Sequence, residues 1–197
     1  HIDLKTKEIK AIGRTLNIVR IGTSGSVQAD IPVDSFVISE KSIGCDGVLR
    51  FYANNESVCD HPFEEAFIRH CRWTPSAARP YVVNADPGLA DRLYDEEHTI
   101  KGVTLTAVGF YGPQGRVLRL PLAMPGINDR ITAFRYEGYK VTNYEMESAA
   151  ITGLCNLLGH RAATICLIIA NRINGDASAD YHSYMNKLIR YTLEKLS

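Results

Sequence analysis

Residues 163–170 (ATICLIIA) are the feature that most limits what this chain can fold into. The run is apolar and rich in β-branched side chains, whereas a strand with one face in solvent alternates apolar and polar residues. It is therefore typical of a strand buried on both faces, as in a sheet that helices cover on both sides. The run indicates an α/β fold.

The rest of the chain alternates predicted strands with predicted helices. Apolar and β-branched runs predict strands at residues 16–21, 32–39, 80–84 and 102–108, and weak alternation suggests another at 47–53. Apolar residues at helical spacing predict helices at residues 63–73, 89–97 and 181–196. Strands that alternate with helices along one chain are typical of a sheet with helices on its faces.

The longest helical pattern lies between these elements. Thr142 or Asn143 can cap it, Met146 belongs to its apolar face, and Gly159 ends it. We therefore expect a single-domain three-layer α/β sandwich, with a central mixed, largely parallel sheet flanked by helices. This domain covers residues 16–197, and residues 1–15 form a polar N-terminal segment.

Charge and composition exclude several classes of partner. The chain has 197 residues, with 22 Lys and Arg against 22 Asp and Glu, so no basic field indicates nucleic acid binding. No apolar run is long enough for a membrane span, and no signal peptide is evident. The five cysteines contain no C-x-x-C pair, which fits reduced thiols in the cytoplasm. We expect a cytoplasmic protein without a nucleic acid or membrane partner.

Residues 20–25 (RIGTSG) are the first of four segments that could carry chemistry. A strand that runs into a Gly-rich turn exposes backbone N–H groups and admits a ligand closely. Arg20 and Thr23 add a charged donor and a hydroxyl, so Arg20, Gly22 and Thr23 together suit a phosphate. A tight turn with an arginine in an ion pair explains the same residues.

Residues 110–116 (FYGPQGR) form the second segment. Gln114 can present an acceptor and a donor side by side, which complements the carbonyl and N–H edge of uracil. Arg116 can offset negative charge on a departing base, and Phe110 offers a flat face for stacking. A surface loop with a structural glutamine is the alternative.

Residues 143–148 (NYEMES) lie where the chain enters the long helix. Glu145 and Glu147 are two positions apart and do not share a helix face, so one can face a ligand while the other serves structure. A carboxylate is a natural acceptor for the two hydroxyls of a ribose, and Met146 can pack on the sugar. Two glutamates that complement a helix dipole, with Met146 in the core, remain an alternative.

Other chemistries find little support. The six histidines lie apart and form no H-x-x-x-H pair, so we expect no metal site. Ser24 and Ser148 lack the G-x-S-x-G pattern of many serine hydrolases.

Taken together, these segments resemble the nucleoside phosphorylase family, and most closely its uridine-phosphorylase branch. The similarity runs from about Leu16 to the C-terminus. The motifs that carry it appear in the family's order and are RIGTSGSVQ from Arg20, Asp46-Gly47, FYGPQGR, NYEMESA, and ANR at residues 170–172. Each motif is weak alone, but five in order are specific.

The resemblance implies a role for each motif residue. It assigns phosphate binding to Arg20, Gly22 and Thr23, and recognition of uracil to Gln114 and Arg116. The remaining residues that it places at the nucleoside are Phe110, Glu145, Met146, Glu147 and Arg172. Among these, Glu147 would bind the ribose diol, and Arg172 would be linked to the base-binding residues. Arg20, Thr23, Arg116 and Glu147 are the residues expected to carry catalysis.

The resemblance also implies the reaction, which is phosphorolysis of a pyrimidine nucleoside in nucleoside salvage. Uridine and inorganic phosphate as co-substrate would give uracil and ribose 1-phosphate, with no metal or organic cofactor, in a homo-oligomer (a dimer or a hexamer). Related purine phosphorylases carry an aspartate that protonates the departing purine, and Ala170 occupies the matching position here. This difference favours uridine.

The chain departs from the family at its front. The family's N-terminal strand and its glycine-aspartate phosphate loop do not precede Leu16, so we expect the fold to be N-terminally incomplete. A partner subunit normally donates a histidine and an arginine from that region. The alternatives are a purine nucleoside phosphorylase, a nucleosidase that uses water, and a nucleoside-binding protein without catalysis.

Overall fold

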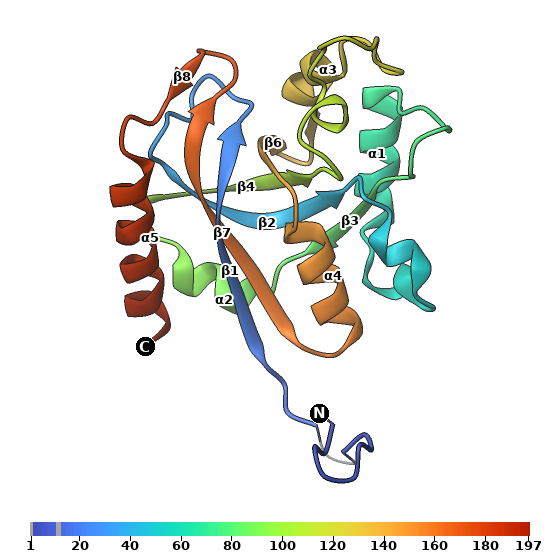
Figure 1. Cartoon of the computed structure of the whole chain (residues 1–197), viewed down its shortest axis with the longest axis vertical. Coiled ribbons are helices and arrows are strands. Elements are labelled where there is room, and N and C mark those ends of the chain that lie inside the picture. Colours follow the sequence, from blue (N-terminus) through green and yellow to red (C-terminus); the bar gives the residue numbers. More distant parts are fainter. Residues whose placement is uncertain (1, 11–12) are drawn as a thin grey trace.

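The computed structural model of the protein describes residues 2–10 and 13–197. Its centre is the parallel pair of β1 (Asn17–Ser26) and β7 (Arg161–Asn171), which lie side by side along their whole length (Figure 1). Most of β7 is buried, as expected for a strand covered on both faces. The apolar run at residues 163–170 therefore forms the strand that the sequence predicts.

The other strands extend this pair into one curled sheet. They are β2 (Phe36–Gly44), β3 (Tyr81–Asn84), β4 (Thr99–Thr106), β5 (Arg135–Tyr136), β6 (Tyr139–Glu145) and β8 (Asp176–Ala177). The sheet has the order β3-β2-β4-β6-β1-β7-β8, and β5 pairs with β6. The long ladders β1–β7 and β2–β4 are parallel, whereas β6 runs antiparallel to β1. Because β2 also pairs with β7, the strands β1, β6, β4, β2 and β7 form a closed ring.

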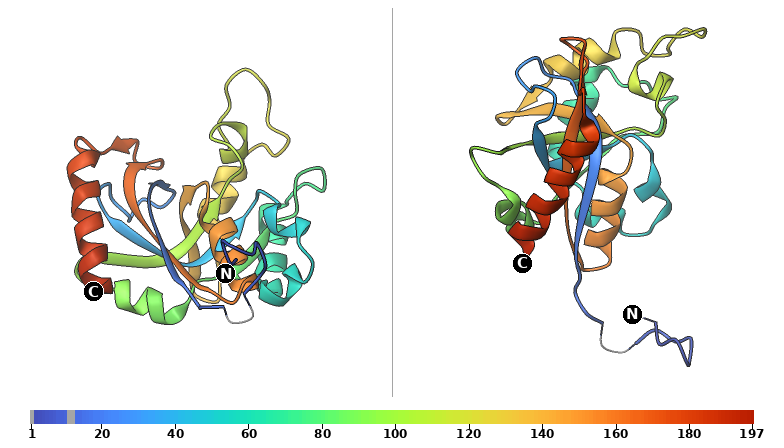
Figure 2. Two further views of the ribbon diagram at one scale, coloured as in Figure 1. Left: turned by 60° about the horizontal axis from the view of Figure 1, so that its bottom comes forward. Right: turned by 60° about the vertical axis from the view of Figure 1, so that its left-hand side comes forward.

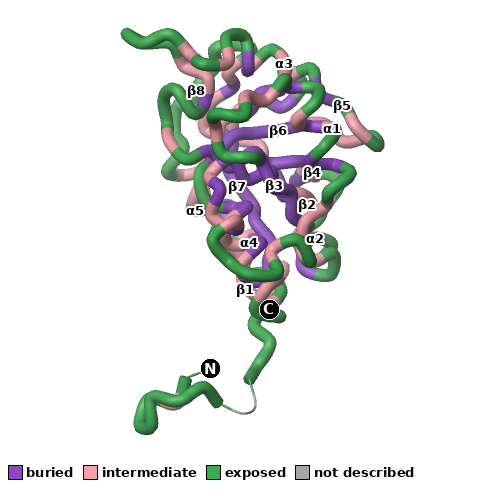
Figure 3. The backbone as a smooth tube through the Cα atoms, turned by 90° about the vertical axis from the view of Figure 1, so that its right-hand side faces the viewer, coloured by how far each residue is buried: buried purple, intermediate pink, exposed green. Residues whose placement is uncertain are grey.

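Helices cover the sheet on its different sides. They are α1 (His61–Cys71), α2 (Pro87–Leu93), α3 (Ile127–Ala133), α4 (Ser148–Leu157) and α5 (Tyr181–Leu196). Helices α2 and α5 pack on β7 at one side, while α4 covers β7 from another and α1 packs with α3 (Figure 2). The central strands hold most of the buried residues (Figure 3). The mixed α/β sheet flanked by helices confirms the expected fold class.

Local sequence signals explain where the helices begin. Asp60, Asp86 and Asp180 each accept a hydrogen bond from a backbone N–H in the first turn of α1, α2 and α5. A proline follows in the first turn of α1 and of α2, where it needs no hydrogen-bond donor.

Several predictions of local structure are wrong. Residues 47–53 contain a 3-10 helix, η1 (Val48–Phe51), because Asp46 accepts a hydrogen bond from the backbone N–H of Val48 at 2.9 Å and turns the chain. The segment RIGTSG contains no turn, since β1 continues to Ser26 in register with β7. Thr142 and Asn143 lie inside β6 and do not cap α4, which begins at Ser148.

The prediction that Met146 lies on the apolar face of the long helix is also wrong. It lies between β6 and α4 with 39% of its surface exposed, so it does not belong to the apolar face of the helix. No helix among the described residues is long and apolar enough to cross a membrane.

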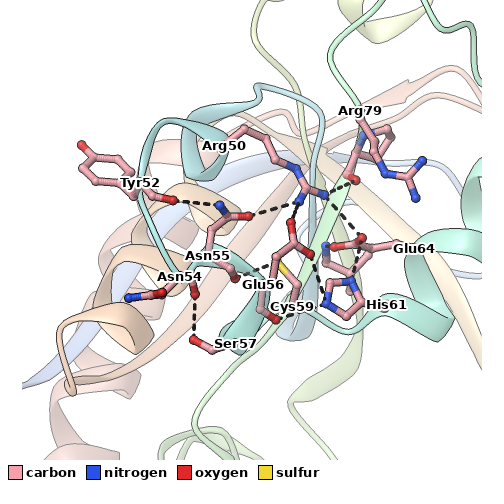
Figure 4. Close-up of polar contacts among 12 residues, drawn as sticks. Arg50, Tyr52, Asn54, Asn55, Glu56, Ser57, Cys59, His61, Glu64 and Arg79 are labelled. Carbon is pink, nitrogen blue, oxygen red and sulfur yellow. Dashed lines mark hydrogen bonds and ion pairs between the residues drawn. The ribbon is translucent and has the colours of Figure 1, made fainter.

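A polar network fixes the segment between β2 and α1 (Figure 4). The guanidinium of Arg50 contacts the carboxylates of Glu56 at 2.6 Å and Glu64 at 3.4 Å. The imidazole of His61 lies between the same two carboxylates, at 3.2 Å from Glu56 and 3.3 Å from Glu64. The hydrogen bond with Glu64 raises the pKa of His61 above its ordinary value of 6.5.

This network predicts a pH-dependent stability. A raised pKa means that His61 stabilises the fold fully below pH 6.5, and that this contribution is lost as the pH rises through the folded-state pKa. The difference in melting temperature between the wild type and His61→Gln should therefore be larger near pH 6 than near pH 8.5. His182→Gln, at an exposed position of α5, is the control. An equal difference at both pH values would contradict the prediction.

Candidate active site

The antiparallel pairing of β1 and β6 brings two of the four predicted segments together. Gly25 pairs with Tyr144 and Ser26 with Asn143, so RIGTSG lies beside the end of β6. The side chain of Arg20 reaches Glu147 in a short hydrogen bond and lies 3.4 Å from Glu145. The first cluster of the site therefore consists of one guanidinium and two carboxylates.

The guanidinium of Arg20 folds back over Gly22. A Cβ atom at Gly22 would lie only 2.4 Å from Nη1 of Arg20, so the glycine gives this side chain its space. On its other side, Nη1 donates to the sulfur of Cys166 at 3.3 Å. Burial raises the pKa of the Cys166 thiol to about 12, which keeps the thiol neutral. Burial also disfavours the charged form of Arg20, but its neighbours, the two carboxylates among them, outweigh this and raise the pKa of Arg20.

The two glutamates of NYEMES occupy different environments. The side chain of Glu145 is 0% exposed, whereas that of Glu147 is 54% exposed. The carboxylate of Glu145 accepts hydrogen bonds from the backbone N–H groups of Glu147 and Ser148, both at 2.8 Å. Glu147 and the half-exposed Met146 are therefore accessible to a ligand, whereas Glu145 is enclosed by protein donors.

A second cluster is centred on Gln114, which is 2% exposed. Its Oε1 atom accepts a hydrogen bond from Arg116 at 2.8 Å and another, short one from Arg172. The guanidinium of Arg116 stacks 3.9 Å from the ring centre of Phe110, and that of Arg172 lies 4.5 Å from the ring centre of Tyr144. The amide of Gln114 is thus fixed between two stacked arginines.

The charge in this cluster is concentrated. Burial, together with the positive charge of Arg116, lowers the pKa of Arg172 to about 10. Both arginines share the neutral acceptor of Gln114, so the cluster has a positive electrostatic potential. It suits a ligand on which negative charge develops.

The two clusters lie at the same edge of the sheet. Arg172 follows β7 and stacks on Tyr144, the residue before Glu145. The Nε atom of Arg172 is also 3.1 Å from the position of a Cβ atom at Gly25. Thr23 lies between Arg20 and Gly25 on β1. Sequence reasoning missed Tyr144 and Cys166, because their contacts depend on strand register.

A cavity lies beside the second cluster. It has a volume of about 830 Å³, and among the predicted site residues only Arg116 lines it. Its other walls are mostly apolar and include Trp73, Met124 and Tyr144. Arg20 and Glu147 lie outside it, so cavity size alone would not have located the first cluster. Among residues 2–10 and 13–197, no group of three His, Cys, Asp or Glu side chains is placed to hold a metal ion.

The structure is thus an α/β fold that carries an arginine–carboxylate cluster and an arginine–glutamine cluster at one edge of its sheet. Residues 6–192 match the family model of the phosphorylase superfamily. The chain belongs to the phosphorylase superfamily. The predicted resemblance to nucleoside phosphorylases, and to their uridine-phosphorylase branch, is confirmed.

Individual relatives agree with this assignment. The chain is 36% identical over 160 residues to uridine phosphorylase A of Schistosoma mansoni, covering 80% of this chain and 49% of that protein. It is 27% identical over 176 residues to a uridine phosphorylase of Thermococcus kodakarensis, covering 86% and 53%. The chain thus spans about half the length of these curated relatives.

A solved structure supports the fold. A nucleoside phosphorylase of Trypanosoma brucei, described as showing uridine phosphorylase activity, superimposes with a TM-score of 0.81 at 22% sequence identity. The superposition covers 98% of this chain and 71% of that structure.

The Gln114 cluster predicts a sharp difference between two substitutions. Gln114→Leu removes the shared acceptor and leaves two guanidinium groups facing each other, which should cost about 1–3 kcal/mol of unfolding free energy. Gln114→Glu places a carboxylate between the two arginines and should be at least as stable as the wild type. Denaturant unfolding at neutral pH measures both, and equal stability of Gln114→Leu and the wild type would contradict the prediction.

Proposed function

We propose that the site catalyses phosphorolysis of a pyrimidine nucleoside, which converts uridine and phosphate to uracil and ribose 1-phosphate. The observation that carries the proposal is the placement of the Arg20–Glu147 cluster and the Gln114–Arg116–Arg172 cluster at one edge of the sheet. The names of the relatives, which are uridine phosphorylases, support it. The protein would be a pentosyltransferase.

Each group of residues has a part in the reaction. Arg20, Thr23 and the backbone at Gly22 hold the phosphate beneath the sugar, and Glu147 accepts hydrogen bonds from the ribose hydroxyls beside Met146. A phosphate oxygen attacks the anomeric carbon and forms the new C–O bond as the C–N bond to uracil breaks. The electron pair of that bond moves onto the base, whose ring nitrogen then takes up a proton.

The base-binding residues act on this developing charge. Arg116 and Gln114 contact the base edge, and Phe110 stacks on the ring. Arg172 holds the amide of Gln114 in place through its short hydrogen bond to Oε1. Catalysis is then mainly positioning and preorganised electrostatics, with inorganic phosphate as co-substrate and no metal or organic cofactor.

Ligand binding requires the first cluster to open. Before ligands bind, Arg20 and Glu147 are paired with each other. Phosphate binds the guanidinium of Arg20, and the ribose diol binds the carboxylate of Glu147. The two ligands together therefore replace this ion pair.

We also infer that the protein acts as a cytoplasmic homo-oligomer. Its five cysteines are free thiols, which fits a reducing compartment. Leu118 and Leu120, which line the cavity beside the second cluster, are 67% and 79% exposed, which favours association with another surface. Light scattering tests the oligomeric state, and a monomer at micromolar concentration would contradict this inference.

The first prediction from this proposal concerns substrate and co-substrate. The protein should release uracil from uridine only when inorganic phosphate is present, and should leave inosine intact because Ala170 supplies no acid to protonate a purine. Chromatography of the reaction with and without phosphate measures this. Release of uracil without phosphate would instead indicate a hydrolase. Release of hypoxanthine from inosine would indicate a purine enzyme. No release from either nucleoside would indicate a nucleoside-binding protein without catalysis.

A second prediction concerns the ribose diol. Glu147→Ala should lower kcat/KM for uridine by about 10–100-fold, because hydrogen bonds to a charged acceptor contribute about 1.5–3 kcal/mol. The loss should be smaller for 2′-deoxyuridine, which lacks one hydroxyl. The melting temperature should change little, since the Glu147 side chain is 54% exposed. Glu97→Ala, at another exposed glutamate, is the matched control. An equal loss of kcat/KM for uridine and 2′-deoxyuridine would mean that Glu147 does not bind the ribose diol.

A further inference from the structure

We infer that Thr106 and Glu145 form a positioning pair that sets Arg20 and Glu147 for the reaction, and that neither contacts the substrate. The inference rests on the proposed function and assigns a role to Thr106, which no sequence motif includes. Thr106 is the last residue of β4, and Glu145 is the last residue of β6, directly beside it in the parallel register. Both are buried, at 0% and 3% exposure.

Protein donors contact both oxygens of the carboxylate of Glu145, whose side chain is 0% exposed. Its Oε2 atom accepts from the backbone N–H groups of Glu147 and Ser148 at 2.8 Å each, and lies 3.4 Å from Nη2 of Arg20. Its Oε1 atom accepts a short hydrogen bond from the hydroxyl of Thr106. Because this side chain is enclosed by protein, a ribose hydroxyl does not reach it, and Glu145 acts through its neighbours.

Thr106 extends this arrangement into the helix. Its hydroxyl donates to Glu145 and accepts from the backbone N–H of Ala149 at 2.9 Å. Together, the two side chains hold the N–H groups of Glu147, Ser148 and Ala149, which have no partner within α4 itself. The backbone that carries the exposed carboxylate of Glu147 is thus tied to two strands of the sheet.

The pair also keeps Arg20 in place during binding. Arg20 contacts two carboxylates, and only Glu147 is accessible to a ribose. When the nucleoside takes Glu147, Glu145 remains as the counter-charge that holds the guanidinium toward the phosphate. One buried carboxylate therefore orders the phosphate-binding and the ribose-binding groups at the same time.

Thr106→Val tests this role without touching any residue that meets a substrate. Valine has nearly the shape of threonine but neither donates nor accepts a hydrogen bond, so Glu145 and the N–H of Ala149 each lose a partner. We expect KM to rise for both phosphate and uridine, and kcat/KM to fall about tenfold, which corresponds to one hydrogen bond to a charged group. Thr106→Ser keeps the hydroxyl and should restore both KM values to within about threefold of the wild type.

Thr192→Val provides the matched control. Thr192 is equally buried and donates to the carbonyl of Leu188 within α5, away from the site. A purely structural role of Thr106 would lower kcat through loss of folded protein and leave both KM values unchanged. That result, or unchanged kinetics in Thr106→Val, would overturn the inference. A rise in KM for uridine alone would mean that Glu145 itself binds the ribose, which would also overturn it.

Amide hydrogen exchange separates this inference from the proposed function. In Thr106→Val, the amides of Glu147, Ser148 and Ala149 should exchange at least about tenfold faster than in Thr106→Ser, as seen by NMR of the unliganded protein. Unchanged exchange would overturn the positioning pair whatever the enzyme does. Faster exchange in a protein whose wild type lacks phosphorolysis would refute only the proposed function.

Discussion

The site depends on the last residues of β1, which pair with β7 on one side and with β6 on the other. Along β7 it is paired in parallel register, which shifts between Ser24 and Gly25, so that Ser24 pairs with Ile168 and Gly25 with Ala170. At this point β1 also begins to pair with β6. The extra residue, Ile169, lies on β7, and an extra residue of this kind bends the strand that carries it and increases the local twist. The strand β1 thus carries Arg20 beside β7 and, at its last two residues, meets the end of β6.

The residue after Ala170 stabilises this junction. The side chain of Asn171 donates to the carbonyls of Gln28 and Ile31 and accepts from the N–H groups of Ile173 and Asn174. It therefore ties the chain after β1 to the chain after β7. Arg172 is the next residue, so its side chain contacts Gln114 from a backbone that Asn171 holds in place. The motif ANR joins a structural asparagine to an arginine that belongs to the site.

The sequence predicted the elements whose signals are local. The strand β7 follows from its apolar run, and α5 follows from its amphipathic spacing. By contrast, β6 was missed, because Asn143 resembles a helix cap and is instead buried at 0% exposure. Asn143 contacts Ser24 at 2.9 Å and Thr104 at 3.0 Å. Such hydrogen bonds across strands satisfy a buried polar side chain only once the register is known.

In the site, too, local signals predicted some features, while others depend on packing. Spacing alone predicted that Glu145 and Glu147 face different ways, but only the packing shows which of them is enclosed. The result is an uneven distribution of charge, with two carboxylates around Arg20 and two guanidiniums around the neutral Gln114. In the proposed reaction, cleavage of the glycosidic bond develops positive charge on the sugar and negative charge on the base. A site already polarised in that sense stabilises the charge separation without reorganising, because its dipoles and charges are fixed by the fold.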